Sequence, residues 1–403
     1  MEESELYNIQ TCFNGSRCKL YDLATWKNGA AFKGVKVSPS GKPIIKIAEL
    51  NNGISESTIC TDEQFSEDIL LHKGDLVFAW SGNPETSIDI FRYNLTDGWL
   101  NQHIFKVTVN EKAIDRDFFF YLMKYIKPNF KKIASNKQTT GLGHVTIADL
   151  KAITVTIPNH NLQRHIAEIL KSLDDKIELN NRINHNLEEQ AILAVRRFIF
   201  SDNISTMQKL SLSDVCFKIT DGSHYSPKDE LGSNIPMLSV KDMGHYAFDY
   251  SSCKHISESD YLNMLSNDCV PQIDDVLVAK DGSYLKELFI NKTIKKQAIL
   301  SSIAIFRPNL SLISPELLLY ILKQPQVIKE AKDNYVSGSA LPRIVLKDFK
   351  KLSFNLPPVS QQKEIRDYLA STYSLINHNH NENERLIQSR DALIVKLMNK
   401  YTC

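Results

Sequence analysis

Two stretches of the chain carry the same pattern of apolar positions. From residue 166 to residue 198 these positions alternate at spacings of four and three, which is the seam of a coiled-coil helix. They are Ile166, Leu170, Leu173, Ile177, Asn180, Asn184, Leu187, Ala191, Ala194 and Phe198. Adding 199 to each number gives Ile365, Leu369, Thr372, Ile376, Asn379, Asn383, Leu386, Arg390, Leu393 and Leu397. The pattern predicts two long helices built on one template, with Thr372 and Arg390 as departures from it.

Each predicted helix has two asparagines in the middle of its seam, Asn180 and Asn184 in the first and Asn379 and Asn383 in the second. A buried amide lowers stability but fixes register, because it needs a partner at the same level of the facing helix. In an antiparallel pair these levels meet near mid-length. The alternative is that each helix packs only on its own domain. We expect the pair, and with it a pseudo-twofold relation between the two halves of the chain.

The segments ahead of the helices are also repeated, at offsets between 192 and 200. Residues 73–82 align with residues 273–282, and residues 144–158 align with residues 343–357. Matched pairs include Asp75 and Asp275, Gly82 and Gly282, Asn28 and Asp221, and Gly29 and Gly222. Short β-rich runs and helical stretches alternate with turn signals in each copy. We expect strands at residues 43–47, 76–79, 103–109 and 276–279 and helices at 118–126 and 315–322, which makes each module α+β.

Composition limits the class of protein. The chain has 403 residues, 42% of them hydrophobic, and a net charge of +1, so it can bury several cores but has no overall basic field. A nucleic-acid partner would therefore need a local concentration of positive charge. Seven scattered cysteines without a C-x-x-C pair indicate neither a disulfide framework nor a zinc site. An acidic, polar start and the absence of long apolar runs lead us to expect a cytoplasmic protein.

With these features the chain resembles the specificity subunit of Type I restriction-modification systems, HsdS. The resemblance covers nearly the whole chain. It rests on the strand and turn from Gly74 to Gly82 and its altered copy at residues 274–282, and on the turn at Asp221, Gly222, Ser223 and His224. It also rests on the start of each long helix, with Pro158, Gln163 and Ile166 in the first and Pro358, Gln362 and Ile365 in the second.

The resemblance implies a subunit without catalysis of its own. It would read a split DNA target, one half with each target-recognition domain, while the helices dock two methyltransferase subunits and restriction subunits join the full complex. S-adenosylmethionine, ATP and magnesium would belong to those partners, so we expect no cofactor here. The implied segments are a first recognition domain at 1–158, a spacer helix at 159–200, a second recognition domain at 201–357 and a second spacer helix at 358–403. The helix from Ile166 to Phe198 would be about 50 Å long, against about 34 to 36 Å for a turn of DNA.

The candidate DNA contacts lie in loops rich in amide, hydroxyl and basic groups, the side chains that bind phosphates and base edges. The first module offers Trp80, Ser81, Asn83, Lys137, Gln138, Thr139, Thr140 and His144. The second offers Asp221, Ser223, His224, Lys280, Ser283, Tyr284, Ser337, Ser339 and Arg343. The alternative for each of them is a solvated loop, or a turn residue in the case of Asp221, Ser223 and His224.

Two sequence features could suggest an enzyme, but each can also be explained by a structural role. Asn355, Leu356, Pro357 and Pro358 resemble a methyltransferase motif only loosely, and we interpret them as the end of a strand. Asp275, Glu287 and Lys280 could suggest a nuclease metal site, but Asp275 aligns with Asp75 as a turn residue. A self-sufficient DNA methyltransferase or nuclease, and a scaffold that binds only proteins, remain as alternatives.

The outer faces of the helices should be partly apolar if methyltransferase subunits dock there. The candidates are Ile169, Ile183, Leu193, Ile199, Tyr368, Leu375 and Ile394. The alternative is that these side chains pack against the modules of the chain itself.

Overall fold

The computed structural model describes residues 6–9, 15–55, 57–138, 141–199, 207–282, 285–337 and 343–400. The chain forms two compact units, one of residues 1–177 and 384–403 and the other of residues 178–383. Each unit therefore contains one globular module and a part of both long helices.

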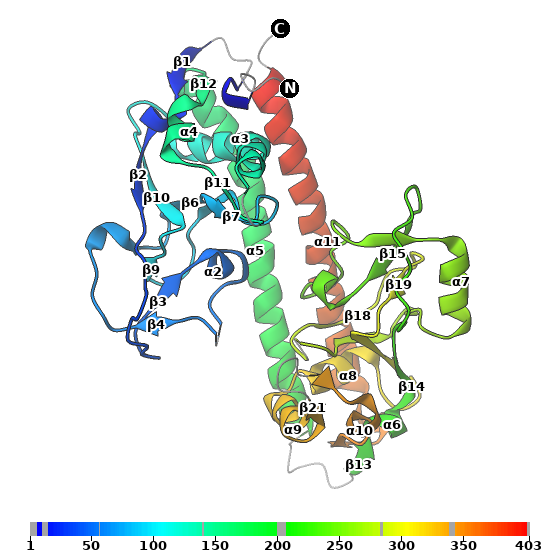
Figure 1. Cartoon of the computed structure of the whole chain (residues 1–403). Helices are drawn as coiled ribbons and strands as arrows, with labels where there is room; N and C mark the ends of the chain where they lie inside the picture. The colour runs from blue at the N-terminus through cyan, green and yellow to red at the C-terminus, as the bar shows by residue number, and fades with distance from the viewer. Residues whose placement is uncertain are drawn as a thin grey trace. The chain divides into compact units, whose positions relative to one another are not determined.

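The two long helices are α5 (His160–Ile199) and α11 (Lys363–Lys400), drawn in green and red in Figure 1. A buried glutamine holds the start of each. Gln163 donates to the carbonyl of Pro158 over 2.7 Å, and Gln362 donates to that of Pro357 over 2.8 Å. The proline equivalent to Pro158 is thus Pro357 and not Pro358, so both copies have the same spacing.

The helices pair antiparallel, as predicted. Within the second unit, Asn180 of α5 donates to Asn383 of α11 over 2.9 Å, and Asn379 donates to Asn184 over 2.8 Å. Residue numbers therefore rise along one helix in the direction in which they fall along the other. All four asparagines are buried, so the amides satisfy one another inside the seam. Their role in fixing the register stays a prediction.

The first module is built on an antiparallel sheet in the order β2-β10-β6-β8. These strands are Ala24–Asn28, Ile104–Val109, Leu76–Ala79 and Asp89–Arg92. A second sheet has the order β4-β3-β9-β5, with strands Cys60–Thr61, Lys42–Ile45, Gly98–Leu100 and Leu70–Leu71. Two small pairs complete it, β1 (Ser16–Lys19) with β12 (Thr154–Ile157) and β7 (Ser81–Gly82) with β11 (Gly143–His144).

The second module repeats the order of the main sheet. Its antiparallel sheet is β14-β20-β17-β18, with strands Cys216–Asp221, Ile303–Pro308, Val276–Ala279 and Leu288–Ile290. Its second sheet is β16-β15-β19, with strands Lys254–Ile256, Ile235–Leu238 and Ala298–Ile299. The small pairs are β13 (Gln208–Ser211) with β23 (Ser353–Leu356) and β21 (Val336–Ser337) with β22 (Arg343–Ile344). The two modules therefore share the strand order of their main sheet, which supports their origin in a single repeated fold, whereas the second sheet has no counterpart of β5 and an isolated bridge between Asp281 and Arg343 takes the place of the β7–β11 pair.

Each module buries both faces of its main sheet, because side chains alternate along a strand. In β6, Leu76 and Phe78 join a core that includes Ile166 and Leu170 of α5, whereas Val77 and Ala79 face the second sheet. Strand β17 divides its four side chains in the same way. The modules are therefore packed directly onto the portions of the long helices that belong to their own units.

The helices that follow the main sheet differ between the modules. In the first module α3 (Arg116–Asn136) is continuous, whereas in the second the equivalent stretch is divided into α8 (Pro315–Leu322) and α9 (Pro325–Tyr335). Pro325 starts a new helix because proline lacks the N–H that would continue the first. The other helices are α2 (Ile47–Asn52), α4 (Ile147–Ala152), α6 (Leu212–Val215), α7 (Glu258–Ser266) and α10 (Leu346–Phe349).

The strands predicted at 76–79 and 276–279 and the helix at 315–322 are confirmed at both ends. The strand predicted at 43–47 is shorter, because α2 begins at Ile47. The helix predicted at 118–126 extends to Asn136 despite Pro128 in its interior. In the described part of the chain, no helix combines the length and apolar character that crossing a membrane requires.

Candidate nucleic-acid interface

The residue directly after the central strand is anchored identically in both modules. The Trp80 N–H donates to the His103 carbonyl over 3.2 Å, and the Trp80 carbonyl accepts from Val145 over 2.8 Å. At the equivalent position, Lys280 donates to Ser302 over 2.9 Å and accepts from Ile344 over 3.0 Å. The main chain is thus held in the same way at Trp80 and at Lys280. We call this position the platform of each module.

The side chains on this platform have different chemistry. The Trp80 indole donates to Asn28 Oδ1 over 3.0 Å, and its ring stacks on Phe105 at a centroid distance of 5.5 Å. Lys280 instead forms an ion pair with Asp221 Oδ2. The repeat aligns Asn28 with Asp221, so a neutral aromatic pair in one module is replaced by an ionic pair in the other.

The glycine after each acceptor is required by a close approach of two chains. A Cβ on Gly29 would lie 2.2 Å from the Asn101 carbonyl oxygen, and one on Gly222 would lie 2.3 Å from that of Ile299. Both distances are far below van der Waals contact. The two modules therefore keep Asn-Gly and Asp-Gly because only glycine lets β2 and β14 leave the sheet at this point.

In the first module, the structure brings three of the predicted residues together. His144 Nδ1 lies 2.8 Å from Ser81 Oγ, where β11 pairs with β7. The rings of His144 and Trp80 are 5.9 Å apart. Trp80, Ser81 and His144 therefore form one cluster, although Ser81 itself is buried.

The remaining predictions in the first module are less concentrated. Asn83 is exposed and holds a turn, since its side chain accepts from the N–H of Glu85. Lys137 forms an ion pair with Asp149, which is buried. Gln138 is exposed. Thr139 and Thr140 lie outside the described residues.

In the second module, Asp221 and Lys280 are joined as described above. Ser223 is buried, and its hydroxyl donates to the Tyr225 carbonyl over 2.8 Å, which fits the turn role that the sequence left open. His224 is exposed, 3.6 Å from Asp221. Arg343 is exposed and pairs with Ser337 across β22 and β21. Ser283, Tyr284 and Ser339 lie outside the described residues.

The residues considered for a metal site have separate partners. Arg307 binds both carboxylate oxygens of the fully buried Asp275, each over 2.9 Å. Glu287 contacts His245, and Lys280 contacts Asp221. Across the described ranges, no cluster of three or more His, Cys, Asp or Glu side chains is arranged to hold a metal ion. Asn355 lies within β23 and pairs with Lys209, as expected for a strand end.

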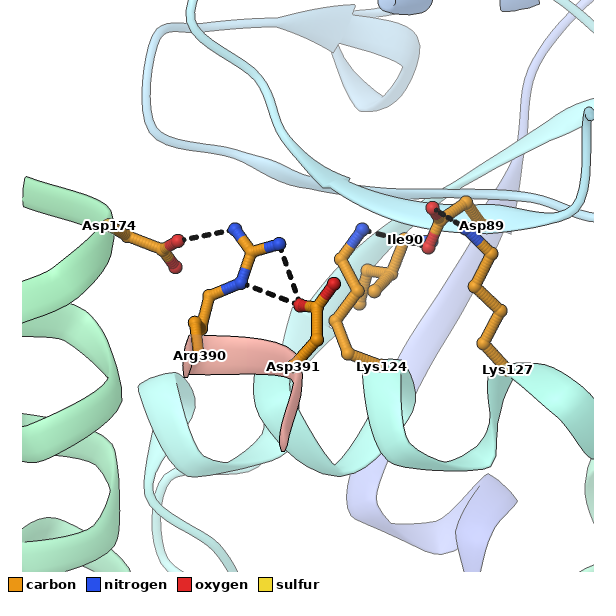
Figure 2. Close-up of polar contacts among 7 residues, drawn as sticks. All are labelled: Asp89, Ile90, Lys124, Lys127, Asp174, Arg390 and Asp391. Atoms are coloured by element: carbon orange, nitrogen blue, oxygen red, sulfur yellow. Dashed lines mark hydrogen bonds and ion pairs between the residues drawn. The ribbon is translucent and has the colours of Figure 1, made fainter. Parts of the chain in front are cut away.

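Arg390 stands where the heptad pattern predicts an apolar residue, and it belongs to a polar layer that is shown in Figure 2. Within the first unit, the Arg390 guanidinium donates to Asp174 of α5 over 2.7 Å and to the neighbouring Asp391 over 2.8 Å. Tyr121 of α3 donates to the other oxygen of Asp174 over 2.6 Å. An ion pair therefore replaces the apolar contact that the heptad pattern predicts at this level.

Figure 2 also shows a second ionic group of the first module. Asp89 of β8 accepts from Lys124 over 2.9 Å and pairs with Lys127, both from α3. Burial would raise the pKa of Asp89, but the two lysine charges hold it below its ordinary value. Lys124 aligns with Lys323 at the offset of 199, a correspondence that sequence reasoning missed although the flanking residues YLMK and YILK reveal it.

The candidates for a docking face divide into two groups. Leu193, Tyr368 and Leu375 are exposed, and Ile169 and Ile183 are partly exposed. Ile199 and Ile394 are buried in the cores of their own units, so their assignment to an outer face is wrong. Their side chains point from the helix toward the module, where apolar burial is most favourable.

Two copies of one mixed module, each followed by a helix that pairs antiparallel with the other, define a duplicated protein with an equivalent platform in each module. The family described as Type I restriction modification DNA specificity domain matches residues 17–189 and 204–388, once for each copy. The chain belongs to this family.

Relatives and solved structures agree with this assignment. The chain is 22% identical over 377 residues to the Type I restriction enzyme MjaVIII specificity subunit of Methanocaldococcus jannaschii, covering 88% of this chain and 85% of that protein. It is 23% identical over 421 residues to the HindI specificity subunit of Haemophilus influenzae, covering 82% and 86%. The S subunit structure from M. genitalium aligns with a TM-score of 0.52 at 16% identity, covering 96% of this chain and 97% of that one, and so shares its fold.

Proposed function

We propose that this chain is the DNA-reading subunit of a Type I restriction-modification complex and acts in the cytoplasm. Each module reads one half of a split DNA target, and the paired helices set the gap between the halves. The subunit has no catalysis of its own and binds two methyltransferase subunits, with restriction subunits added in the full complex. Family membership and the specificity subunits among its relatives support this proposal.

One observation carries the proposal of two readers. The modules share their strand order, the main-chain bonds of Trp80 and Lys280, and the close approach at Gly29 and Gly222. They differ in the side chains that stand on this shared scaffold. Two readers of different base sequences need this combination, because base edges are distinguished by donor and acceptor side chains while the scaffold only positions them.

The loops predicted from the sequence remain our candidates for DNA contact, with Trp80, His144, Lys280 and Arg343 at their centres. The proposed boundaries of the recognition domains are residues 1–158 and 201–357, and the spacer helices occupy 159–200 and 358–403. Exposed Leu193, Tyr368 and Leu375 are the proposed methyltransferase contacts on the helices.

The main test gives the platform of the second module the side chains found in the first. The methylome of a host that carries the complete system first gives the wild-type target. In a double variant, Lys280→Trp with Asp221→Asn, the pair found at Trp80 and Asn28 replaces the ionic pair. We expect a changed or relaxed sequence in one half of the target, since a bidentate base contact contributes about 1–3 kcal/mol of discrimination.

The exposed Lys209→Met variant serves as the control, because it removes a lysine from β13 outside the platform. The proposal predicts an unchanged target for it. If the transplant alters neither half of the target, the platform does not read DNA. Methyl transfer by the purified chain alone would instead favour the alternative of a self-sufficient methyltransferase.

The spacer role has a separate test. Deleting one heptad from α5 and the matching heptad from α11 should shorten the tolerated gap between the half-sites by a few base pairs, because seven residues span about 10 Å of helix. The sequence of each half should be unchanged. An unaltered gap would contradict the spacer role without affecting the assignment of the readers.

A further inference from the structure

The second module has an ionic cluster that reaches α5 and that the repeat does not predict. Glu188 of α5 is buried, and its carboxylate accepts from His245 Nε2 over 2.6 Å and from Lys323 at the end of α8. The Tyr246 hydroxyl donates to the same carboxylate over 3.2 Å. All of these residues belong to the second unit.

Comparison of the copies shows how this cluster differs from the equivalent group in the first module. Lys124 of the first module binds Asp89, which stands opposite Ala79 at the end of β8. In the second module the equivalent acid is Glu287, yet Lys323 binds Glu188, and His245 lies between the two acids with Nδ1 at 3.3 Å from Glu287. The position equivalent to Glu188 on α11 is Ile387. The second module therefore has an ionic link from its sheet to a long helix for which Ile387 offers no counterpart.

The link is carried by a tight turn. The Gly244 N–H donates to the Ala247 carbonyl over 2.8 Å, and Met243 pairs with Phe248 on either side. His245 and Tyr246 form the tip of this turn. His245 reaches α5, and the Tyr246 ring lies 6.1 Å from that of His380 on α11. The two side chains thus hold the turn against both long helices within the second unit.

The turn is joined to strands that lie beside a hollow lined by lysine side chains. It lies between β15 and β16, the strands of the second sheet, and Phe248 packs in the core that supports this sheet. Beside the same strands, Pro236, His255, Lys295 and Lys296 help to line a hollow of about 610 Å³. Glu258 also lines this hollow and pairs with Lys296 over 2.7 Å, so a displacement of the turn would move a surface of mixed charge that includes Lys295 and Lys296.

We propose that His245 is a positioning residue, which fixes the second sheet of this module against α5 through Glu188 and so orients the surface that reads one half-site. The proposal rests on the DNA-reading function proposed above. It assigns to His245 a contact with the helix and not with a base.

The charges around His245 determine its pH dependence. Glu188 from α5, Glu287 ahead of β18, Lys323 from α8 and Tyr246 from the turn face the imidazole, with Tyr320 and Tyr373 near Glu188. Hydrogen bonds to Glu188 and then to Glu287 raise the pKa of His245 to about 9. Burial raises the pKa of Tyr246, Tyr320 and Tyr373 as well, so His245 is the first of these groups to lose its proton as the pH rises.

Hydrogen–deuterium exchange of the full chain tests the contact without DNA. In the His245→Gln and Glu188→Gln variants, we expect the amides of the turn and of β15 and β16 to exchange about tenfold faster at neutral pH. The control pair is His185 and Glu189, exposed on the same helix with 3.5 Å between His185 Nε2 and Glu189 Oε1. His185→Gln should leave exchange in the turn unchanged.

A pH series separates positioning from general support of the fold. Corrected for intrinsic rates, wild-type protection should be greatest below about pH 6.5, fall progressively as the pH rises, and reach its lower level at about pH 9. His245→Gln should lack this step, and His245→Arg, which keeps the charge, should restore protection and retain it at pH 10. Equal exchange in His245→Gln and His185→Gln would overturn the proposal, as would failure of arginine to restore protection.

Binding to DNA then tests the functional consequence, with the methyltransferase partner present and the target taken from the methylome. His245→Gln should weaken binding to the intact target about tenfold and lose discrimination at one half-site only. Faster exchange with unchanged discrimination at both half-sites would overturn the link to DNA reading. Absence of sequence-specific binding by the wild-type complex would overturn the proposed function, while the exchange results would still decide whether the contact exists.

Discussion

The asparagine layer gives the sharpest prediction about the coiled coil. Replacing Asn184 by Leu removes its acceptor for Asn379 and its own donation to the Ile376 carbonyl over 3.1 Å. The buried Asn379 amide then lacks this partner, which costs about 1–3 kcal/mol, and the lost bond to Ile376 costs about 1 kcal/mol. Burial of the leucine offsets about 1.5–3 kcal/mol, and its larger volume costs about 1 kcal/mol or more in a packed seam. We expect a net loss of about 1–2 kcal/mol.

The double variant, Asn184→Leu with Asn379→Leu, should recover most of this loss. No amide of the pair remains unpaired in it, and replacing both partners of a buried polar contact by apolar groups is close to neutral or stabilising. A double-mutant cycle measured by urea unfolding should give a coupling free energy of at least about 1 kcal/mol. Asn186→Leu, an exposed change on the same helix, is the control. The reasoning would be refuted if the changes in unfolding free energy of the two single variants add up to that of the double variant within about 0.5 kcal/mol.

Three further predictions concern single sites. Gly222→Ala should destabilise the protein by more than about 2 kcal/mol in urea unfolding, because the new Cβ would lie 2.3 Å from a backbone oxygen that cannot easily move; a cost near zero would show that the chain relaxes there. Arg390→Leu restores the heptad pattern, yet it should lower the unfolding temperature, since it leaves Asp174 without its cation; a gain in stability would show that the apolar contact outweighs the ion pair. The hydrogen bond from His245 and the charge of Lys323 outweigh burial and lower the pKa of Glu188 to about 2, so its contribution should be complete above pH 4.5 and lost as the pH falls through about 2. Glu188→Gln should lack this dependence in acid unfolding, and an identical acid profile would contradict it.

The architecture could be predicted from the sequence because the apolar positions of the two long helices recur at regular spacings. The seam from Ile166 to Phe198 and its copy predict two helices, and the asparagines predict that the helices face each other. Repetition of the modules predicts a common topology without specifying it. The sheet order β2-β10-β6-β8 follows from contacts between distant strands, which no local pattern encodes.

The candidate site was predictable in position and less so in detail. The repeat identified the turn after the central strand, but the partner of Lys280 is Asp221, 59 residues earlier in the chain. Sequence reasoning placed both in the site as separate DNA contacts, whereas in the structure they neutralise each other. The link from Glu188 to His245 joins residues 57 apart and was missed, because neither the helix nor the turn carries a local signal for it.

The way in which the copies have diverged is consistent with a division of roles within each module. Positions that set the main-chain path are retained, as at Gly29 and Gly222, because any side chain there would collide with backbone. Positions that present chemistry have changed in pairs, from Trp80 with Asn28 to Lys280 with Asp221, so that each donor keeps an acceptor. Lys280 is buried, so leaving its ammonium without an acceptor would cost about 1–3 kcal/mol or more, and a change of chemistry at this position is tolerated best when both partners change. The units of variation on this scaffold are therefore residue pairs, and an engineered change of specificity should exchange both members of a pair.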